Sequence, residues 1–209
     1  SEPLPDKERK AALEHLNALQ KDISSLTANV RQIKKSRLLK KEITLEGKIS
    51  LKKPNFFRWE ITGPKKTLTT VNQEKMIVYH PDAKEAQVYD LSEDIVARNM
   101  ANFFSSSFSM SMDELGKKFT VNVFRSGEGL IIELRPRSKT ISRYLETVRI
   151  WYNENTGLPA EFEIKLPKGD LTRTMLSNIK VNPELNPDIF SISLPENVWI
   201  TNKTSEIKN

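Results

Sequence analysis

Hydrophobic and polar residues alternate along most of this chain. The clearest case is AEFEIKL, in which Phe162, Ile164 and Leu166 alternate with charged residues. Successive side chains of a β-strand point to opposite faces, so this pattern predicts a strand with one dry face and one wet face. The same alternation occurs in six other segments: Leu45–Leu51, Phe57–Ile61, Met76–Val78, Phe119–Val123, Leu130–Leu134 and Val148–Ile150.

Turn-forming residues separate these segments, among them Gly63-Pro64 and Asn155-Thr156-Gly157. Strands joined by short turns are typical of hairpins, and a row of hairpins gives an antiparallel sheet. A sheet with a dry face must cover that face, either by curling toward a barrel or by accepting helices. The sequence therefore predicts a mainly β chain with a few covering helices.

Two segments break the alternation and favour helices. Residues 6–23 place Leu13, Leu16 and Leu19 three residues apart behind an acidic first turn, which predicts an amphipathic helix. Residues 91–115 begin like a helix and then become rich in Phe, Met and Ser. Methionine packs adaptably and serine weakens helices, so this segment is interpreted as a lid, or alternatively as a core-packing helix with a loose loop.

The segment KKPNFFRWEITGP, residues 52–64, holds three aromatic residues within four positions. Alternation along a short strand sends Phe57 and Trp59 to one face and Phe56 and Arg58 to the other. The ordinary interpretation is a half-buried strand that faces a core. A functional role for the rings needs support from elsewhere in the chain.

The chain has 209 residues, no cysteine and a formal net charge of +6. This length suits one sizeable domain, and we expect a single domain over residues 1–209. The lack of cysteine excludes disulfides and thiolate metal sites. No run approaches the roughly 18 apolar residues of a membrane span, and the first residues lack the order of a signal peptide.

The positive charge is concentrated in the first quarter of the chain. Residues 1–53 hold 13 Lys or Arg and 7 Asp or Glu, whereas the rest of the chain holds 20 of each. Residues 31–41, RQIKKSRLLKK, form a basic patch without an acid: Arg31, Lys34, Lys35, Arg37, Lys40 and Lys41. Such a patch suits phosphates of nucleic acid, anionic lipid headgroups or an acidic protein, and it equally suits a solvated surface.

Residues that carry catalysis do not form a recognisable set in this sequence. His15 and His80 have no third ligand at metal spacing, and there is no HExxH, no phosphate-binding glycine loop and no GxSxG. Carboxylates such as Glu161 and Glu163 fall on the wet face of a predicted strand, where solvation explains them. We therefore expect no metal site, no cofactor and no enzymatic activity, which favours a binding role.

A longer motif runs from Gly47 to Leu91. It combines a strand that starts at glycine, a basic residue before Pro-Asn, Phe-x-Trp, a later proline, and Tyr-x-Pro-Asp followed by Gln-Val. The matching residues are Gly47, Lys53, Pro54, Asn55, Phe57, Trp59, Pro64, Tyr79, Pro81, Asp82, Gln87 and Val88. This motif resembles the LolA family of periplasmic lipoprotein carriers, and later segments such as LSNIKVN and FSISLPENV are similar to the family's closing strands.

The resemblance implies an α+β fold in which a strongly curved antiparallel sheet forms an incomplete barrel. The N-terminal helix (about 6–23) and a helical lid (about 91–116) would cover it, and a C-terminal tail would begin at about 196. Between sheet and lid, the family holds acyl chains in a hydrophobic cavity. The residues implied to line that cavity are Leu45, Ile49, Leu51, Phe57, Trp59, Ile61, Val78, Met100, Phe103, Phe104, Phe108, Met110 and Met112.

The implied function is that of a soluble carrier in the periplasm. It would take lipoproteins, or another amphiphile, from an inner-membrane releasing transporter to the outer membrane, where a receptor would be the next partner. The basic patch would dock an acidic partner or a headgroup. We expect a monomer that binds no nucleic acid and touches membranes only peripherally.

One departure from the family concerns the lid. The best-known members have an arginine before the proline that bonds lid carbonyls, whereas this chain has Lys53. Lysine is a point charge without a planar fork, so Lys53 is only a candidate latch. The alternative function is a periplasmic sensor of the same fold, which would detect lipoprotein or bind a membrane-anchored regulator.

Overall fold

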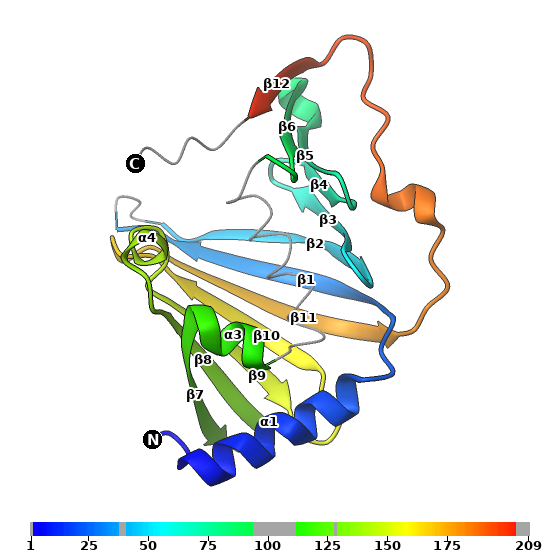
Figure 1. Cartoon of the computed structure of the whole chain (residues 1–209). Coiled ribbons are helices and arrows are strands. Elements are labelled where there is room, and N and C mark those ends of the chain that lie inside the picture. Colours follow the sequence, from blue (N-terminus) through cyan, green and yellow to red (C-terminus); the bar gives the residue numbers. More distant parts are fainter. Residues whose placement is uncertain (1, 38–40, 94–111, 128, 204–209) are drawn as a thin grey trace. The chain divides into compact units, whose positions relative to one another are not determined.

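The structure is a computed structural model that describes residues 2–37, 41–93, 112–127 and 129–203 (Figure 1). Its strands are β1 (Ser25–Lys35), β2 (Ile43–Lys52), β3 (Phe56–Gly63), β4 (Thr67–Val71), β5 (Lys75–His80), β6 (Glu85–Asp90), β7 (Phe119–Ser126), β8 (Gly129–Pro136), β9 (Thr147–Asn153), β10 (Pro159–Lys165), β11 (Leu171–Val181) and β12 (Trp199–Lys203). Its helices are α1 (Asp6–Gln20), α3 (Met112–Lys118), α4 (Lys139–Ser142) and the 3-10 turns η1 (Pro81–Ala83) and η2 (Pro187–Phe190).

The strands form one open sheet in the order β12-β6-β5-β4-β3-β2-β1-β11-β10-β9-β8-β7. The strand pairs are antiparallel from β2 to β6 and from β7 to β11, while β12 lies parallel to β6. The predicted fold class is confirmed, because the chain is mainly β with few helices and an open sheet. Within the predicted C-terminal tail, residues 199–203 form β12.

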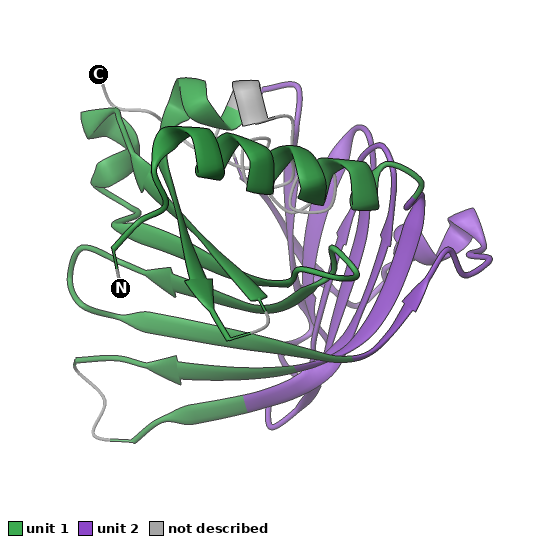
Figure 2. Cartoon of the chain, turned by 90° about the horizontal axis from the view of Figure 1, so that it is seen from below, with its two compact units in different colours: residues 1–22, 31–44, 108–177 green, residues 23–30, 45–107, 178–209 purple. Residues whose placement is uncertain are grey.

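The chain divides into two compact units, which Figure 2 shows in separate colours. Unit 1 comprises residues 1–22, 31–44 and 108–177, and unit 2 comprises residues 23–30, 45–107 and 178–209. Strands β1, β2 and β11 each contribute residues to both units. The prediction of a single domain over the whole chain stays a prediction.

In unit 1, α1 covers one face of the strands. Its leucine stripe is buried, with Leu13 at 7% and Leu16 at 3% exposure. The Gln20 side chain donates to the Gly157 carbonyl over 2.7 Å, and it is also hydrogen-bonded to Tyr152. The predicted helix over 6–23 therefore forms from Asp6 to Gln20, because its apolar stripe has a sheet to pack on.

In unit 2, the segment after β11 covers the face of β3 that carries Phe56 and Arg58. The ring of Phe190 in η2, itself 1% exposed, lies 5.5 Å from that of Phe56. Arg58 Nη1 donates to the Ile189 carbonyl over 2.7 Å. The C-terminal segment therefore packs on the face of β3 opposite to the one that carries Trp59.

Part of the predicted lid lies outside the described residues. These are the positions 94–111, which include Met100, Phe103, Phe104, Phe108 and Met110. Met112 begins α3, and its side chain is also outside the described part. The lid and its lining residues stay predictions.

Candidate functional site: two apolar sheet faces

Strand register gathers the sheet residues that the sequence assigned to a cavity. Ile49 of β2 lies opposite Trp59 of β3, and Leu51 lies opposite Phe57. One strand further, Trp59 lies opposite Thr69 of β4. Because directly paired residues share a face, these side chains form one surface, which we call the apolar face of unit 2. Its predicted members are Leu45, Ile49, Leu51, Phe57, Trp59, Ile61 and Val78.

Burial divides this surface into two parts. Ile49, Leu51 and Phe57 are buried, at 6%, 5% and 4% exposure. Trp59 and Ile61, by contrast, are only half-buried, as are Leu45 and Val78. The Phe57 and Trp59 rings meet edge to face, with centroids 5.9 Å apart, which fixes the orientation of the larger ring. The surface thus has a buried part, formed by Ile49, Leu51 and Phe57, and a partly exposed apolar part.

The sequence analysis left two apolar members of this face out of the predicted cavity, although it placed Met76 in one strand with Val78. Val71 of β4 lies between Phe57 and Met76 in the register, and both Val71 and Met76 are buried, at 2% and 8% exposure. The run TLTTV that forms β4 has no alternation of apolar and polar residues, so hydrophobic periodicity alone did not reveal it. Its β-branched composition was the available signal.

Gly47 brings β2 and β3 unusually close at one end of this face. A Cβ on Gly47 would lie 1.8 Å from the Glu60 carbonyl oxygen, and the β2–β3 register shifts between Glu46 and Gly47. A bulge of this kind bends the strand, and only glycine leaves room for the close approach. Glycine at the first position of the sequence motif therefore has a local structural cause.

Unit 1 has an apolar face of its own, on the side where α1 packs. Under the helix it is fully buried, with Val123, Leu130 and Ile150 at 0% exposure. Away from the most buried positions, Val121, Phe162, Ile164 and Leu176 are half-buried. We call this surface the apolar face of unit 1. The sequence analysis identified its strands but did not propose it as part of a site.

A family of known proteins matches most of this chain. The chain matches the family described as "Outer membrane lipoprotein carrier protein LolA" over residues 21–193. The chain belongs to the LolA family. Carriers of this family are periplasmic binding proteins without enzymatic activity that bind lipoprotein acyl chains, and family membership confirms the predicted periplasmic location. In the described residues, no helix is long and apolar enough to cross a membrane.

Curated relatives in the LolA family come from several bacteria. An outer-membrane lipoprotein carrier protein of Francisella tularensis subsp. tularensis (strain WY96-3418) is 25% identical over 88% of this chain and 84% of its own length. That of Legionella pneumophila (strain Lens) is 26% identical with the same coverage. An uncharacterized conserved protein from Thermus thermophilus matches in structure with a TM-score of 0.56 and 11% identity, over 94% of this chain and 99% of that chain, and shows the shared fold.

Lys53, the residue where this LolA-family chain departs from the family arginine, is half-buried at the end of the β2–β3 hairpin. Its backbone N–H donates to the Ser24 carbonyl over 2.9 Å, and its peptide bond to Pro54 is cis. This contact joins the hairpin to the residue that precedes β1. A role of the Lys53 side chain as a lid latch stays a prediction.

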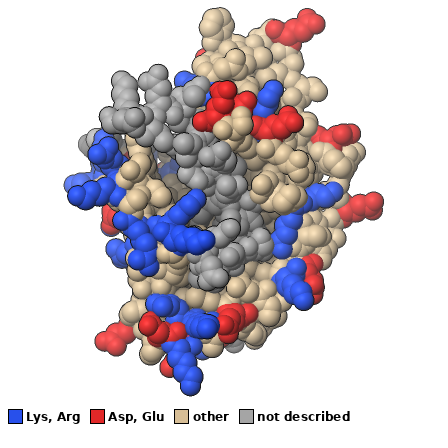
Figure 3. All heavy atoms as spheres, viewed as in Figure 1, with Lys and Arg blue, Asp and Glu red and all other residues tan. Residues whose placement is uncertain are grey.

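The predicted basic patch does not lie on one face of the sheet. Arg31, Lys34 and Lys35 are exposed members of β1, and alternation sends Lys34 to the side opposite Arg31 and Lys35. Lys35 pairs with Glu42 over 2.6 Å. Arg37 and Lys41 are also exposed, and Lys40 lies outside the described residues. Figure 3 shows lysine and arginine side chains at several separate places on one face of the molecule.

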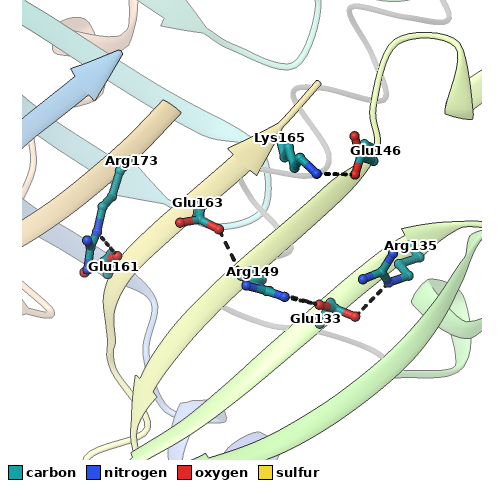
Figure 4. Close-up of polar contacts among 8 residues, drawn as sticks. All are labelled: Glu133, Arg135, Glu146, Arg149, Glu161, Glu163, Lys165 and Arg173. Carbon is teal, nitrogen blue, oxygen red and sulfur yellow. Dashed lines mark hydrogen bonds and ion pairs between the residues drawn. The ribbon is translucent and has the colours of Figure 1, made fainter. Parts of the chain in front are cut away.

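The face of unit 1 opposite α1 carries ion pairs within and between strands (Figure 4). Its centre is Glu133, which accepts from Arg135 Nε over 2.8 Å and from Arg149 Nε over 2.9 Å. Further pairs join Arg149 to Glu163, Arg173 to Glu161 and Lys165 to Glu146. We call this surface the charged face of unit 1. Burial raises the pKa of Glu133, but the hydrogen bonds from Arg135 and Arg149 lower it by more than burial raises it. The pKa of Glu133 therefore lies below the ordinary value.

Both histidines have protein partners in the described residues. His15 Nε2 lies 3.0 Å from the Glu154 carbonyl oxygen, and His80 Nδ1 lies 3.3 Å from Thr67 Oγ1. No group of three or more potential metal ligands occurs among the described side chains. These histidines therefore have structural contacts that do not depend on a metal.

Proposed function

We propose that this protein carries lipoproteins, or a related amphiphilic lipid, through the periplasm by binding their acyl chains. The observation that supports this most is the apolar face of unit 2. Trp59, Ile61 and Val78 lie on the same side as the buried Leu51 and Phe57, yet remain half-buried. Apolar area that the chain itself leaves partly exposed is what a lipid tail would cover.

The energetics explain why such a face suits transport. Burial of an acyl chain is worth about 0.8 kcal/mol per methylene, so only a site that also removes the tail from water can receive it from a membrane. A half-exposed apolar surface can contact the tail directly, whereas a closely packed core would have to rearrange before it could bind one. On this proposal the protein is not an enzyme, an inner-membrane transporter loads it, and an outer-membrane receptor unloads it.

The experiment compares two neighbouring positions of β3 that differ in burial. Delipidated protein is titrated with a fluorescent acyl probe in its wild-type form and as Ile61→Glu and Thr62→Glu. Ile61 lies half-buried on the apolar face, whereas Thr62 is exposed, so the two variants add the same charge at neighbouring positions of different burial. We expect saturable binding that Ile61→Glu weakens at least about tenfold, because a carboxylate placed among apolar groups is costly, and that Thr62→Glu leaves within about twofold.

Two results would contradict the proposal. One is the absence of saturable binding by the wild-type protein. The other is equal binding by Ile61→Glu and Thr62→Glu when circular dichroism shows both variants folded.

A further inference from the structure

The charged residues of the unit 1 strands are sorted between the two faces. Among the described strand residues, acids and bases occupy the charged face, with two exceptions on the apolar face: Lys34 at the end of β1 and Arg125 near the end of β7. The strand positions of the apolar face carry no acid among these described residues. A cation on an otherwise uncharged surface calls for a separate explanation.

The side of Lys34 follows from its neighbour in alternation. The Gln32 side chain donates from Nε2 to Thr174 Oγ1 over 3.0 Å. Thr174 lies opposite Phe162 in the β10–β11 register, which places it on the apolar face. Gln32 and Lys34 are two residues apart on the same strand, so Lys34 shares this face, and Lys35 points to the other.

Polarity changes in a fixed order on this face of unit 1. Phe162 is half-buried opposite Thr174, Gln32 is buried at 7% and hydrogen-bonded to Thr174, and Lys34 is exposed. At about 3.3 Å per residue, the step from Gln32 to Lys34 covers roughly 7 Å. An amphiphile has the same order of groups, from an apolar tail through a polar linkage to a charged head.

Lys34 also differs from the other cation of this face in its contacts. Arg125 Nη1 is held by both carboxylate oxygens of Glu154, at 2.8 and 2.9 Å. The Lys34 side chain makes neither a hydrogen bond nor an ion pair with any residue that the structure describes. Asp170, at the adjoining turn, accepts from the Ser36 hydroxyl over 2.9 Å and from the Arg37 N–H over 3.1 Å. Within the described part of the chain, no carboxylate therefore pairs with the Lys34 ammonium group.

We infer that Lys34 contacts the anionic group of an amphiphile bound on the apolar face of unit 1, so that the protein prefers lipids with a carboxylate or phosphate next to the acyl chain over neutral lipids of the same chain. This inference rests on the proposed function and names the class of cargo. It separates Lys34 from Arg31 and Lys35, which point to the charged face.

The experiment uses competition for a fluorescent acyl probe by hexadecanoate and by its methyl ester, at a pH where the acid is ionised. Wild-type protein, Lys34→Gln and Lys35→Gln are compared at low and moderate salt. The two variants remove the same charge from adjacent exposed positions on opposite faces. Inorganic phosphate is a third competitor, which tests whether the cation binds an anion without a tail.

The wild-type protein and Lys35→Gln should bind the acid about two- to fivefold more tightly than the ester, as for one exposed ion pair. This preference should shrink with salt, be absent in Lys34→Gln, and not extend to free phosphate. Equal preference in the two variants, or none in the wild type, overturns the inference while leaving acyl binding intact. If neither compound displaces the probe and the probe itself does not bind, the proposed function fails instead.

Discussion

Replacement of Glu133 by glutamine tests how the charged face of unit 1 contributes to stability. The Glu133 side chain is only 3% exposed, whereas its partners Arg135 and Arg149 are 51% and 43% exposed. Asn122 Nδ2 also donates to Glu133, over 3.4 Å. Glu133→Gln keeps the volume and one carbonyl acceptor but removes the charge that both guanidinium groups share.

The size of the effect follows from these exposures. A hydrogen bond to a charged group contributes about 1.5–3 kcal/mol when water is excluded, but an exposed ion pair contributes about 0.2–1 kcal/mol. Because the carboxylate is buried and both guanidinium groups are half in water, we place the loss for the two pairs together at about 1–2 kcal/mol. For a domain of this size, such a loss lowers Tm by about 3–6 °C.

Thermal unfolding followed by circular dichroism measures this loss, with Glu163→Gln as the matched control. Glu163 lies on the same face and approaches Arg149 only to 3.9 Å, so its loss should stay below about 0.5 kcal/mol. The pKa of Glu133 is lowered in the folded state, so its contribution is present above the ordinary carboxyl pKa of about 4.3 and is lost as pH falls through the folded value. Equal stability of Glu133→Gln and wild type at neutral pH, or a difference that persists undiminished in acid, would refute this reasoning.

Two further predictions concern Gly47 and Tyr152. Gly47→Ala should lower the free energy of unfolding by about 2 kcal/mol or more in urea denaturation, because its methyl group meets the Glu60 carbonyl. In the control Gly63→Ala, nothing lies within 4 Å of the added carbon, so this variant should lose less than half of that amount. Similar losses in the two variants would contradict the close approach at Gly47. Burial raises the pKa of Tyr152 above its ordinary value, so its contribution to stability is complete below about pH 10 and is lost as pH rises further; Tyr152→Phe should lose stability less steeply in alkali, and parallel alkaline curves for the two proteins would exclude this role.

The faces of the hairpins in unit 2 could be predicted from the sequence because alternation is a local property. Placing Phe57 and Trp59 on one side and Phe56 and Arg58 on the other needed only the period of a strand, and the register and the η2 contacts agree. The partners on each side could not be predicted in this way. Phe190 contacts Phe56 although the two residues are 134 positions apart in the sequence, and a local pattern cannot predict a contact between such distant positions.

The strands β1 and β12 show the other limit of local patterns. The C-terminal half of β1 is rich in lysine and arginine, so the sequence favoured a charged patch over a strand, and the division of its cations between two faces was missed. Its apolar half was hidden by the small residues Ser25 and Ala28. In β12, exposed Trp199 and Ile200 give no alternation, and the strand exists through its backbone pairing with β6.

On the apolar face of unit 1, the apolar side chains and Lys34 would contribute unequally to the proposed recognition of an amphiphile. A sixteen-carbon tail brings on the order of 12 kcal/mol of burial, which any apolar surface of sufficient area receives in the same way. An exposed ion pair adds at most about 1 kcal/mol. Affinity must therefore depend steeply on chain length, while discrimination between amphiphiles with the same tail falls to the head. The described strand side chains on the apolar face of unit 1 include no acid that would repel an anionic head. The small contribution of the Lys34 ion pair therefore favours the anionic amphiphile over the neutral one.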